Sequence, residues 1–330
     1  MAATTITVPT NSGAPSGWGF TWNQTNTSGG VISNVYQPTL SNKPIQTLVF
    51  MFNGSGVSNN GDETTYTAIT NDSQITLSGG SNGSGGNAIQ MGDGNGTLKI
   101  DFNRTTADSN KFILDLSNTT GSYSFIGNIE TSYGNNKKYS GSSYFQAKFG
   151  ASVKGNITLN SGGATSSSTP ALSFTNGAKL EGNLSVGYED TYITFAGNGG
   201  GITGNVSKTS TGKLNIVFDS TNGGSIGSGT SNTIKTTAEG ATTITNLTSI
   251  NVGSISASSN GSNTITLTPS QALNLSAEIT VTGGKNKLVF NKDAKGIDNP
   301  HGKYNISIKW RILRGEYPST QCKQCYFGSR

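Results

Sequence analysis

The stretch FGASVKGNITL at residues 149–159 is followed by a similar stretch, NGAKLEGNLSV, at residues 176–186. Each contains a glycine, an aliphatic residue, a charged residue and then the triplet Gly-Asn-aliphatic. This triplet occurs four times at intervals of 28, 27 and 22 residues, beginning at Gly127, Gly155, Gly182 and Gly204. A motif that returns at a nearly constant interval predicts a repeat architecture.

Large apolar residues return at a similar interval along most of the chain. Successive members of this ladder are 21–26 residues apart, namely Phe52, Leu77, Phe102, Phe125, Phe149, Phe174, Phe195, Phe218, Ile244, Leu267 and Phe290. The residue two positions before each member is apolar or aromatic except at Thr242, which is typical of strands with one buried face. Each unit is interpreted as a strand, a Gly/Asn turn, a second strand and a polar loop.

These patterns predict an all-β fold, a right-handed parallel β-helix of about eleven coils over residues 45–295, with 21–26 residues in each coil. One unit cannot bury its own apolar face, whereas stacked units form a continuous core. We expect the ladder aromatics to point inward in one column, specifically Phe102, Phe125, Phe174, Phe195, Phe218 and Phe290. A two-sheet antiparallel sandwich is the alternative.

The composition argues against several classes of function. Charged residues make up only 12% of the 330 residues, against about 25% in an average soluble domain. Residues 301–330 hold six of the 22 Lys and Arg and one of the 17 Asp and Glu, so residues 1–300 carry 16 of each. A neutral body lacks the basic footprint of a nucleic-acid binder. No apolar run has the length of a membrane helix, and no signal peptide is visible.

The repeat pattern and the Gly/Asn/Ser/Thr-rich composition resemble the passenger domains of bacterial type V autotransporters, especially the vacuolating-cytotoxin-like group. The resemblance covers about residues 45–295 and implies a surface-exposed or secreted stalk, adhesin or toxin-like interaction module. It also implies an N-terminal signal and an outer-membrane β-barrel translocator in the full-length protein. We expect a passenger fragment, cytoplasmic if expressed alone, whose parent binds a host-cell surface, a matrix component or neighbouring cells.

From about residue 296 the sequence changes in style, and residues 296–330 are treated as an atypical C-terminal tail. Residues 301–330 contain the single His, both Cys, one of three Trp and three of four Arg. A small functional appendage and a frameshifted segment are both open interpretations. We do not expect the tail to join the core column. A strand packed over the last coil is one allowed outcome, because apolar residues alternate at Tyr304, Ile306, Ile308 and Trp310.

Candidate metal, redox and nucleophile motifs are isolated. Cys322 and Cys325 form a C-x-x-C pair, but no βαβ unit surrounds them and only His301 could add a zinc ligand. GDGNGTLKI at residues 92–100 partly matches a calcium-binding nonapeptide, with Gly96 in place of the required Asp. A Ser-His-Asp site would need His301, which lies outside the repeats. We therefore expect no metal and no cofactor.

The candidate catalytic acids are Glu189 and Asp190, an adjacent pair in a loop between two repeat units. A polysaccharide-cleaving β-helix would gather such acids with a base in one groove, yet the body of the chain contains a single arginine, Arg104. Asp101 and Asp115 alternate with apolar residues and are expected to face outward. No enzyme is predicted, and a carbohydrate-active lyase or glycosidase fragment is the alternative.

Residues 1–44 are expected to form an N-terminal cap or a leading coil. Trp18, Phe20 and Trp22 are spaced by two, which puts them on one face of a strand. A ligand-stacking patch is one interpretation. An open solenoid end needs an apolar cover, so we predict that these aromatics form a cap on the first coil.

Overall fold

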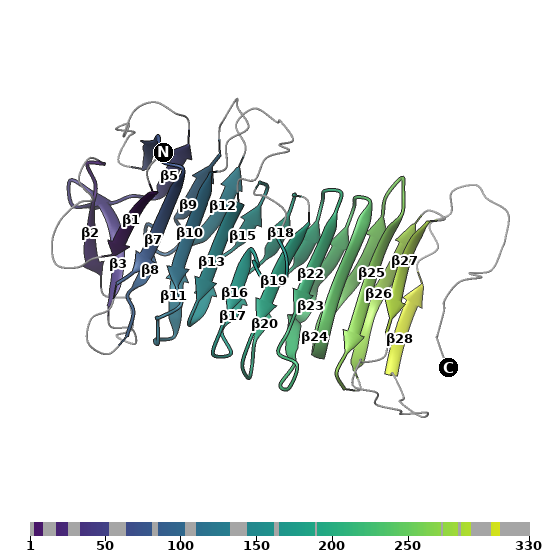
Figure 1. The fold of residues 1–330 in the computed structure, drawn as a ribbon. Coiled ribbons are helices and arrows are strands. Elements are labelled where there is room, and N and C mark those ends of the chain that lie inside the picture. The colour runs from purple at the N-terminus through teal and green to yellow at the C-terminus, as the bar shows by residue number, and fades with distance from the viewer. Residues whose placement is uncertain are drawn as a thin grey trace.

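The computed structural model describes residues 3–8, 18–25, 34–52, 64–80, 85–102, 110–132, 144–161, 165–188, 190–271, 273–282, 285–291 and 305–310. These residues form strands, turns and loops that wind around a single axis (Figure 1). No helix long and apolar enough to cross a membrane occurs in this part of the chain.

Equivalent strands of successive coils pair in parallel and build three sheets. The first sheet contains β1 (Ala3–Val8), β7 (Gln74–Gly79), β10 (Lys111–Leu116), β13 (Tyr144–Phe149), β16 (Leu172–Phe174), β19 (Thr191–Phe195), β22 (Lys213–Val217), the start of β24 (Gly240–Ser258), β25 (Asn263–Pro269) and β27 (Asn286–Phe290). The second contains β3 (Val35–Leu40), β8 (Ala88–Gln90), β11 (Tyr123–Ile126), β14 (Ser152–Lys154), β17 (Lys179–Glu181), β20 (Gly201–Ile202), the start of β23 (Gly224–Thr236) and the middle of β24.

The third sheet completes each coil. It contains β6 (Thr65–Thr70), β5 (Thr47–Phe52), β9 (Thr97–Asp101), β12 (Asn128–Ser132), β15 (Ile157–Leu159), β18 (Leu184–Val186), β21 (Val206–Lys208), the ends of β23 and β24, and β26 (Asn274–Thr282). The predicted parallel β-helix is confirmed. The predicted two strands per unit are wrong, because each coil has three, some of only two or three residues.

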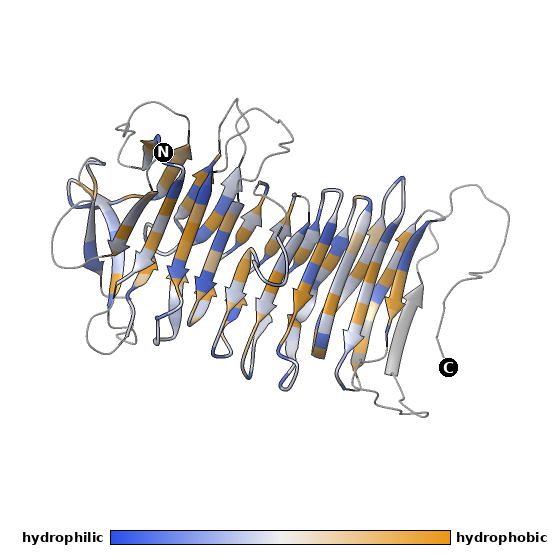
Figure 2. Ribbon diagram, in the orientation of Figure 1, coloured by the Kyte–Doolittle hydropathy of each residue, from blue (hydrophilic) through white to orange (hydrophobic). Residues whose placement is uncertain are grey.

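Antiparallel pairing between described strands is confined to the N-terminal end, where β2 (Thr21–Thr25) and β4 (Lys43–Pro44) both pair with β3. The sandwich alternative is therefore wrong. Hydrophobic and hydrophilic residues alternate along the strands, as the banding in Figure 2 shows. One inward column of the first sheet has one member per coil, namely Leu77, Leu114, Ala147, Leu172, Ile193, Ile216, Ile244, Leu267 and Phe290.

The single aromatic column predicted from the ladder is wrong, although its members from Phe52 to Leu267 are buried. Phe174, Phe195 and Phe218 do stack in the first sheet. Phe125 belongs instead to the second sheet, beside Val153. The remaining two also lie elsewhere: Phe102 stacks on Phe52 beside the third sheet, and Phe290 continues the column of Leu267.

The cause of the error is the unequal length of the coils. Paired residues are 37 residues apart between β7 and β10 and 33 apart between β10 and β13, but only 21–28 apart in the later coils of the first sheet. Since all three strands of a coil bury alternate residues, a step of about 24 residues in a long coil reaches another buried position on a different sheet. Part of the difference lies between the third and first sheets, where the connections have nine residues (102–110) and eleven residues (133–143) in the two long coils but only three or four in the coils after β18.

The regular coils hold a continuous aromatic stack in the first sheet. The ring of Phe195 lies 4.5 Å from that of Phe174 and 5.0 Å from that of Phe218, measured between centroids. Phe149 extends the stack at 5.0 Å from Phe174. Each ring therefore has partners above and below, and removing one leaves a cavity that two coils share.

Phe195→Ala is expected to destabilise the fold by about 3–5 kcal/mol, because a buried ring is replaced by a cavity. The measurement is urea unfolding followed by circular dichroism. Thr266→Ala on the outer face of β25 is the matched control and should change stability by less than about 0.5 kcal/mol. Equal midpoints for the two variants would contradict the burial of Phe195.

The Gly-Asn-aliphatic triplets form the corner between the second and third sheets. The backbone N–H of Asn156 donates to Oδ1 of Asn128 at 3.0 Å, and its side-chain amide donates to the same oxygen at 3.1 Å. Asn183 repeats both bonds onto Asn156, and the N–H of Asn205 donates to Oδ1 of Asn183. This asparagine ladder supplies hydrogen-bond partners where the chain turns away from the sheets.

The preceding glycines let the coils approach at this corner. A Cβ on Gly155 would lie 1.9 Å from the carbonyl oxygen of Gly127, and one on Gly182 would lie 2.0 Å from that of Gly155. Gly155 also has a φ of 139°, which side-chain-bearing residues rarely adopt. Stacking of the coils therefore requires the glycine of the Gly-Asn-aliphatic triplet, which is why the triplet repeats along the sequence.

Gly155→Ala is expected to destabilise the protein by at least about 1–3 kcal/mol, since the new methyl group meets a backbone carbonyl and the backbone is strained. Gly229→Ala is the control, because a Cβ there has no atom within 4 Å. Thermal unfolding of both variants checks the prediction. A Gly155→Ala midpoint equal to that of Gly229→Ala would show that the corner relaxes freely.

The two ends of the solenoid differ. Trp18, Phe20 and Trp22 are all buried, with Trp18 packed edge-on against Phe50 and Phe20 against Tyr66. This burial fits the predicted cap rather than an exposed stacking patch, although only Trp22 lies within a strand. At the other end, β28 (Asn305–Trp310) pairs in parallel with β26, so the strand allowed for this part of the tail is confirmed.

Candidate functional surface

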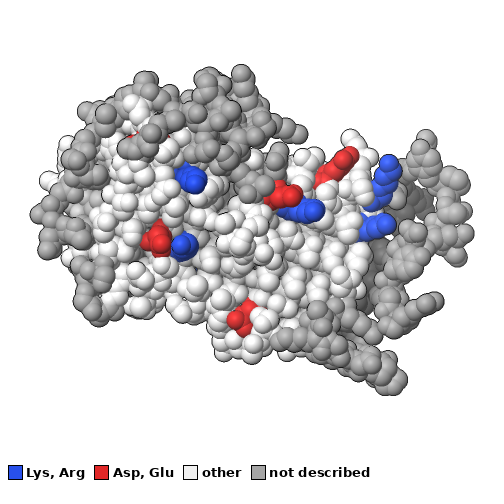
Figure 3. All heavy atoms as spheres, in the orientation of Figure 1, with Lys and Arg blue, Asp and Glu red and all other residues white. Residues whose placement is uncertain are grey.

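The outer face of the first sheet presents two rows of side chains that follow the coil axis. The first row includes Thr76, Ile113, Gln146, Tyr192, Asn215, Thr243, Thr266 and Val289. The second includes Ser78, Asp115, Lys148, Ser173, Thr194, Val217, Thr245 and Thr268. Most of these groups are uncharged, and Figure 3 shows charged residues only scattered over the side that it draws.

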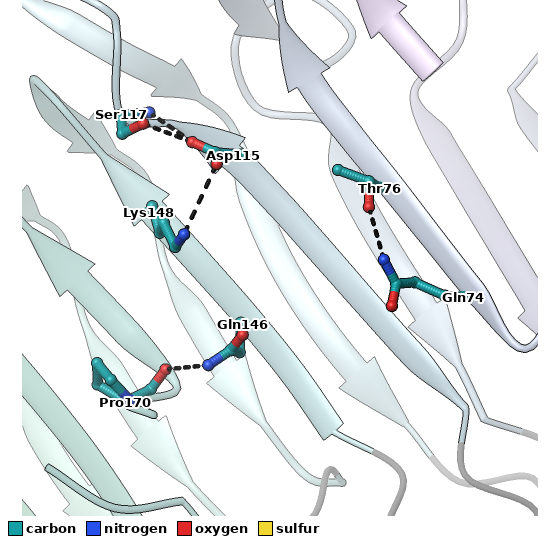
Figure 4. Close-up of polar contacts among 7 residues, drawn as sticks. All are labelled: Gln74, Thr76, Asp115, Ser117, Gln146, Lys148 and Pro170. Atoms are coloured by element: carbon teal, nitrogen blue, oxygen red, sulfur yellow. Dashed lines mark hydrogen bonds and ion pairs between the residues drawn. The ribbon is translucent and has the colours of Figure 1, made fainter. Parts of the chain in front are cut away.

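The N-terminal half of this face is occupied by its own contacts (Figure 4). Asp115 accepts hydrogen bonds from the backbone and hydroxyl of Ser117 at 3.2 and 2.6 Å and lies 3.8 Å from the Lys148 ammonium. The amide of Gln146 donates to the carbonyl of Pro170. These groups stabilise loops and strand pairs, and the exposed ion pair contributes little on its own.

The C-terminal half of the face is different. Thr243 and Thr245 of β24 lie beside Thr266 and Thr268 of β25 in register, and all four are half-buried. We call these four residues the threonine patch. Neighbouring hydroxyls are spaced about 4.8 Å across the strands and about 6.6 Å along them. Among the described residues, none of these hydroxyls has a protein hydrogen-bond partner. The patch can therefore donate and accept hydrogen bonds outward at regular intervals.

The candidate catalytic acid Asp190 stabilises the backbone. Its Oδ1 accepts a hydrogen bond from the N–H of Lys213 at 2.8 Å, which begins the next strand of the first sheet. Asp219 acts similarly: backbone N–H groups of Asn222, Gly197 and Thr221 lower the pKa of its carboxyl. Asp101 and Asp115 take outward strand positions, as predicted. The remaining candidates Glu189 and Arg104 lie outside the described residues.

The structure describes part of the motifs that were considered as metal or redox sites. GDGNGTLKI begins as a turn in which Gly92 and Gly94 have positive φ and Asp93 accepts a hydrogen bond from the N–H of Asn95. Across the part of the chain that the structure describes, no three His, Cys, Asp or Glu residues form a possible metal site. His301, Cys322 and Cys325 lie outside the described residues.

A buried lysine is the feature that the sequence analysis missed. Lys208 takes an inward position at the end of β21, in register with Val186 and Thr236, and is fully buried. Its ammonium donates to the carbonyl oxygens of Ser210 at 2.6 Å and Glu239 at 2.9 Å. Burial lowers its pKa, and the charge of Asp190 partly offsets this. The alternation Val206-Ser207-Lys208 was the available signal. The contacts point to a structural role, because they join the loops of two coils.

A second polar cluster lies on the second sheet. The hydroxyl of Tyr123 donates to the Glu181 carboxylate at 2.8 Å, two coils away, and the Lys154 ammonium lies 6.0 Å from the Tyr123 ring centroid. Partial burial, followed by the hydrogen bond and negative charge of Glu181, raises the pKa of Tyr123 to about 12. The cluster links three successive coils.

The Tyr123 hydroxyl is expected to ionise near pH 12, and Glu181→Gln should lower that pKa toward its ordinary value of about 10. Since the folded pKa exceeds the unfolded one, the stabilisation is complete below about pH 10 and is lost as the pH rises toward 12. Tyrosinate absorbance is measured as the difference between the wild type and Tyr123→Phe. A Tyr123 that titrates near pH 10 in the wild type would rule out the contact.

Comparison with known proteins found no matching family model, no similar curated protein and no similar solved structure. The class of the protein therefore rests on its fold, which is that of a parallel β-helix.

Proposed function

We propose that the chain is part of the passenger of a vacuolating-cytotoxin-like type V autotransporter and acts at the cell surface as a stalk and interaction module. The parent would carry an export signal and an outer-membrane translocator. In this role the β-helix holds a binding surface away from the membrane. The partner would be a host-cell surface, a matrix component or a neighbouring cell.

The threonine patch is the observation that carries the interaction part of the proposal. Four hydroxyls stand in register on a rigid sheet, with no partner among the described residues. Such an array suits a ligand with repeated hydrogen-bonding groups, such as a surface polysaccharide, because no backbone ordering is needed on binding. The repeat fold supports the stalk part, since each coil mainly contacts its neighbours and length is gained by adding coils.

Fluorescently labelled full-length chain should bind at least one member of a panel of host cells, matrix proteins and surface polysaccharides. Alanine at all four patch positions, Thr243, Thr245, Thr266 and Thr268, should weaken that binding at least about tenfold, since several hydrogen bonds of about 0.5–1.5 kcal/mol each are lost. Binding is measured by flow cytometry and biolayer interferometry.

The matched control removes four hydroxyls from the outer face of the third sheet, at Thr158, Ser185, Ser207 and Ser256. Both quadruple variants should keep the wild-type melting temperature within a few degrees. Equal loss of binding in both variants would remove the patch from the interaction. Absence of binding by the wild type to the whole panel would end the adhesive interpretation, and depolymerisation of a bound polysaccharide would favour the enzyme alternative.

Passenger identity has a separate test. With an export signal at its N-terminus and an autotransporter barrel at its C-terminus, the chain should reach the bacterial surface and become accessible to external protease. A Gly155→Ala version should be displayed less efficiently because its coils stack poorly. Retention of the folded wild-type chain in the periplasm would contradict the passenger proposal.

A further inference from the structure

Among the described residues, the last strand of the first sheet leaves part of the core without a neighbouring strand. Leu288 and Phe290 of β27 are in register with Ile265 and Leu267 of β25. Ile265 and Leu267 are 0% exposed, whereas Leu288 and Phe290 are only partly buried. Within the described residues, β27 pairs with β25 and has no strand on its other edge. Within the described part of the chain, this edge therefore combines backbone groups without a strand partner and an incompletely covered apolar column.

The opposite end of the molecule shows how a closed end is built here. Trp18, Phe20 and Trp22 cover the core, and β2 pairs in an antiparallel direction against β3. The described C-terminal end, where β27 and β28 lie in Figure 1, has only parallel strands. Its geometry is therefore that of an interior coil, which is suited to receiving another parallel strand.

The partners of outward lysines on other strands indicate which residue the added strand should place opposite Lys287. Outward Lys99 is in register with Glu130 on the next coil, 3.5 Å away between charged atoms. Lys148 is in register with Asp115 in the same way, at 3.8 Å. Lys287, which is exposed on β27, has Thr264 on its paired side. An acid on the open side would complete the arrangement seen at the two interior lysines.

This pattern has a third example and exceptions at Lys111, Lys179 and Lys235, whose registered partners are not acids: Lys111 lies between Gln74 and Tyr144, and Lys179 lies opposite Gly201. Lys154 is in register with Glu181 across β14 and β17. Lys235 has serines on both sides in the third sheet, Ser207 and Ser256. Opposite charges directly across a strand pair are favourable and like charges are unfavourable. A second copy of β27 added in the same register would put lysine against lysine, so the edge discriminates against its own sequence.

We propose that the open edge of β27 binds a parallel β-strand with the pattern acid-apolar-any-apolar. The acid lies opposite Lys287 and the two apolar residues lie opposite Leu288 and Phe290. The new strand satisfies the backbone groups of β27 and covers the end of the inward column. The site is distinct from the threonine patch and does not depend on the proposed surface function.

A peptide from the chain itself provides the probe. Residues 274–282, NLSAEITVT, place Glu278, Ile279 and Val281 in the required pattern. The labelled peptide should bind the full-length chain in a fluorescence anisotropy titration. Glu278→Ala in the peptide should weaken binding about 1.4- to 5-fold, as expected for loss of one cross-strand pair, and Glu278→Lys should weaken it further because it places like charges opposite each other. A peptide with proline at both Ile279 and Thr280 should not bind, because it lacks two backbone donors.

Charge reversal on the protein gives the decisive comparison. Lys287→Glu should weaken binding of the Glu278 peptide and restore binding of its Glu278→Lys form. Lys287 is exposed, so this variant should retain the wild-type melting temperature. The proposal is overturned if the Glu278 peptide does not bind, if the proline peptide binds equally well, or if Lys287→Glu leaves both affinities unchanged. Self-association of the chain in sedimentation, abolished by Phe290→Asp, would also overturn it by assigning the edge to a second copy.

Discussion

Parallel pairing between successive coils is the constraint on which the rest of the structure depends. Neighbouring strands must lie about 4.8 Å apart on every side of the coil at once. The corners must therefore pack as closely as the sheets, and the glycines before Asn156 and Asn183 make this possible, because any Cβ would meet the carbonyl of the coil below. The asparagine side chains then satisfy the backbone at the turn. Because of this spacing, inward side chains of successive coils contact each other and outward side chains lie in register.

The sequence was sufficient to predict the fold class, because a coil with such a corner repeats both its glycine and its buried residues. It was insufficient to predict the phase of the ladder. Phe125 and Phe174 look equivalent in spacing, yet they lie on different sheets, since coils of 33 and 37 residues precede the regular ones. Short strands such as Leu184–Val186 were not recognised, because three residues carry too little alternation to distinguish a strand from a loop.

Less of the candidate surface than of the fold could be predicted from the sequence. The outward position of Asp115 followed from alternation alone. The threonine patch did not, because it depends on the register between β24 and β25, and Thr is abundant throughout the chain. Lys208 was missed for a related reason: a lysine is usually assigned outward, and its burial depends on carbonyl groups supplied by other loops.

The connections between the third and first sheets vary in length more than the connections at the other corners. The connections there have up to twelve residues, while the glycine-asparagine corner uses as few as one or two residues in the regular coils. Added residues on that edge alter neither the inward columns nor the pairing register. This edge therefore tolerates changes in the length of its connections, including an inserted epitope, while the residues that fix the other edges stay unchanged.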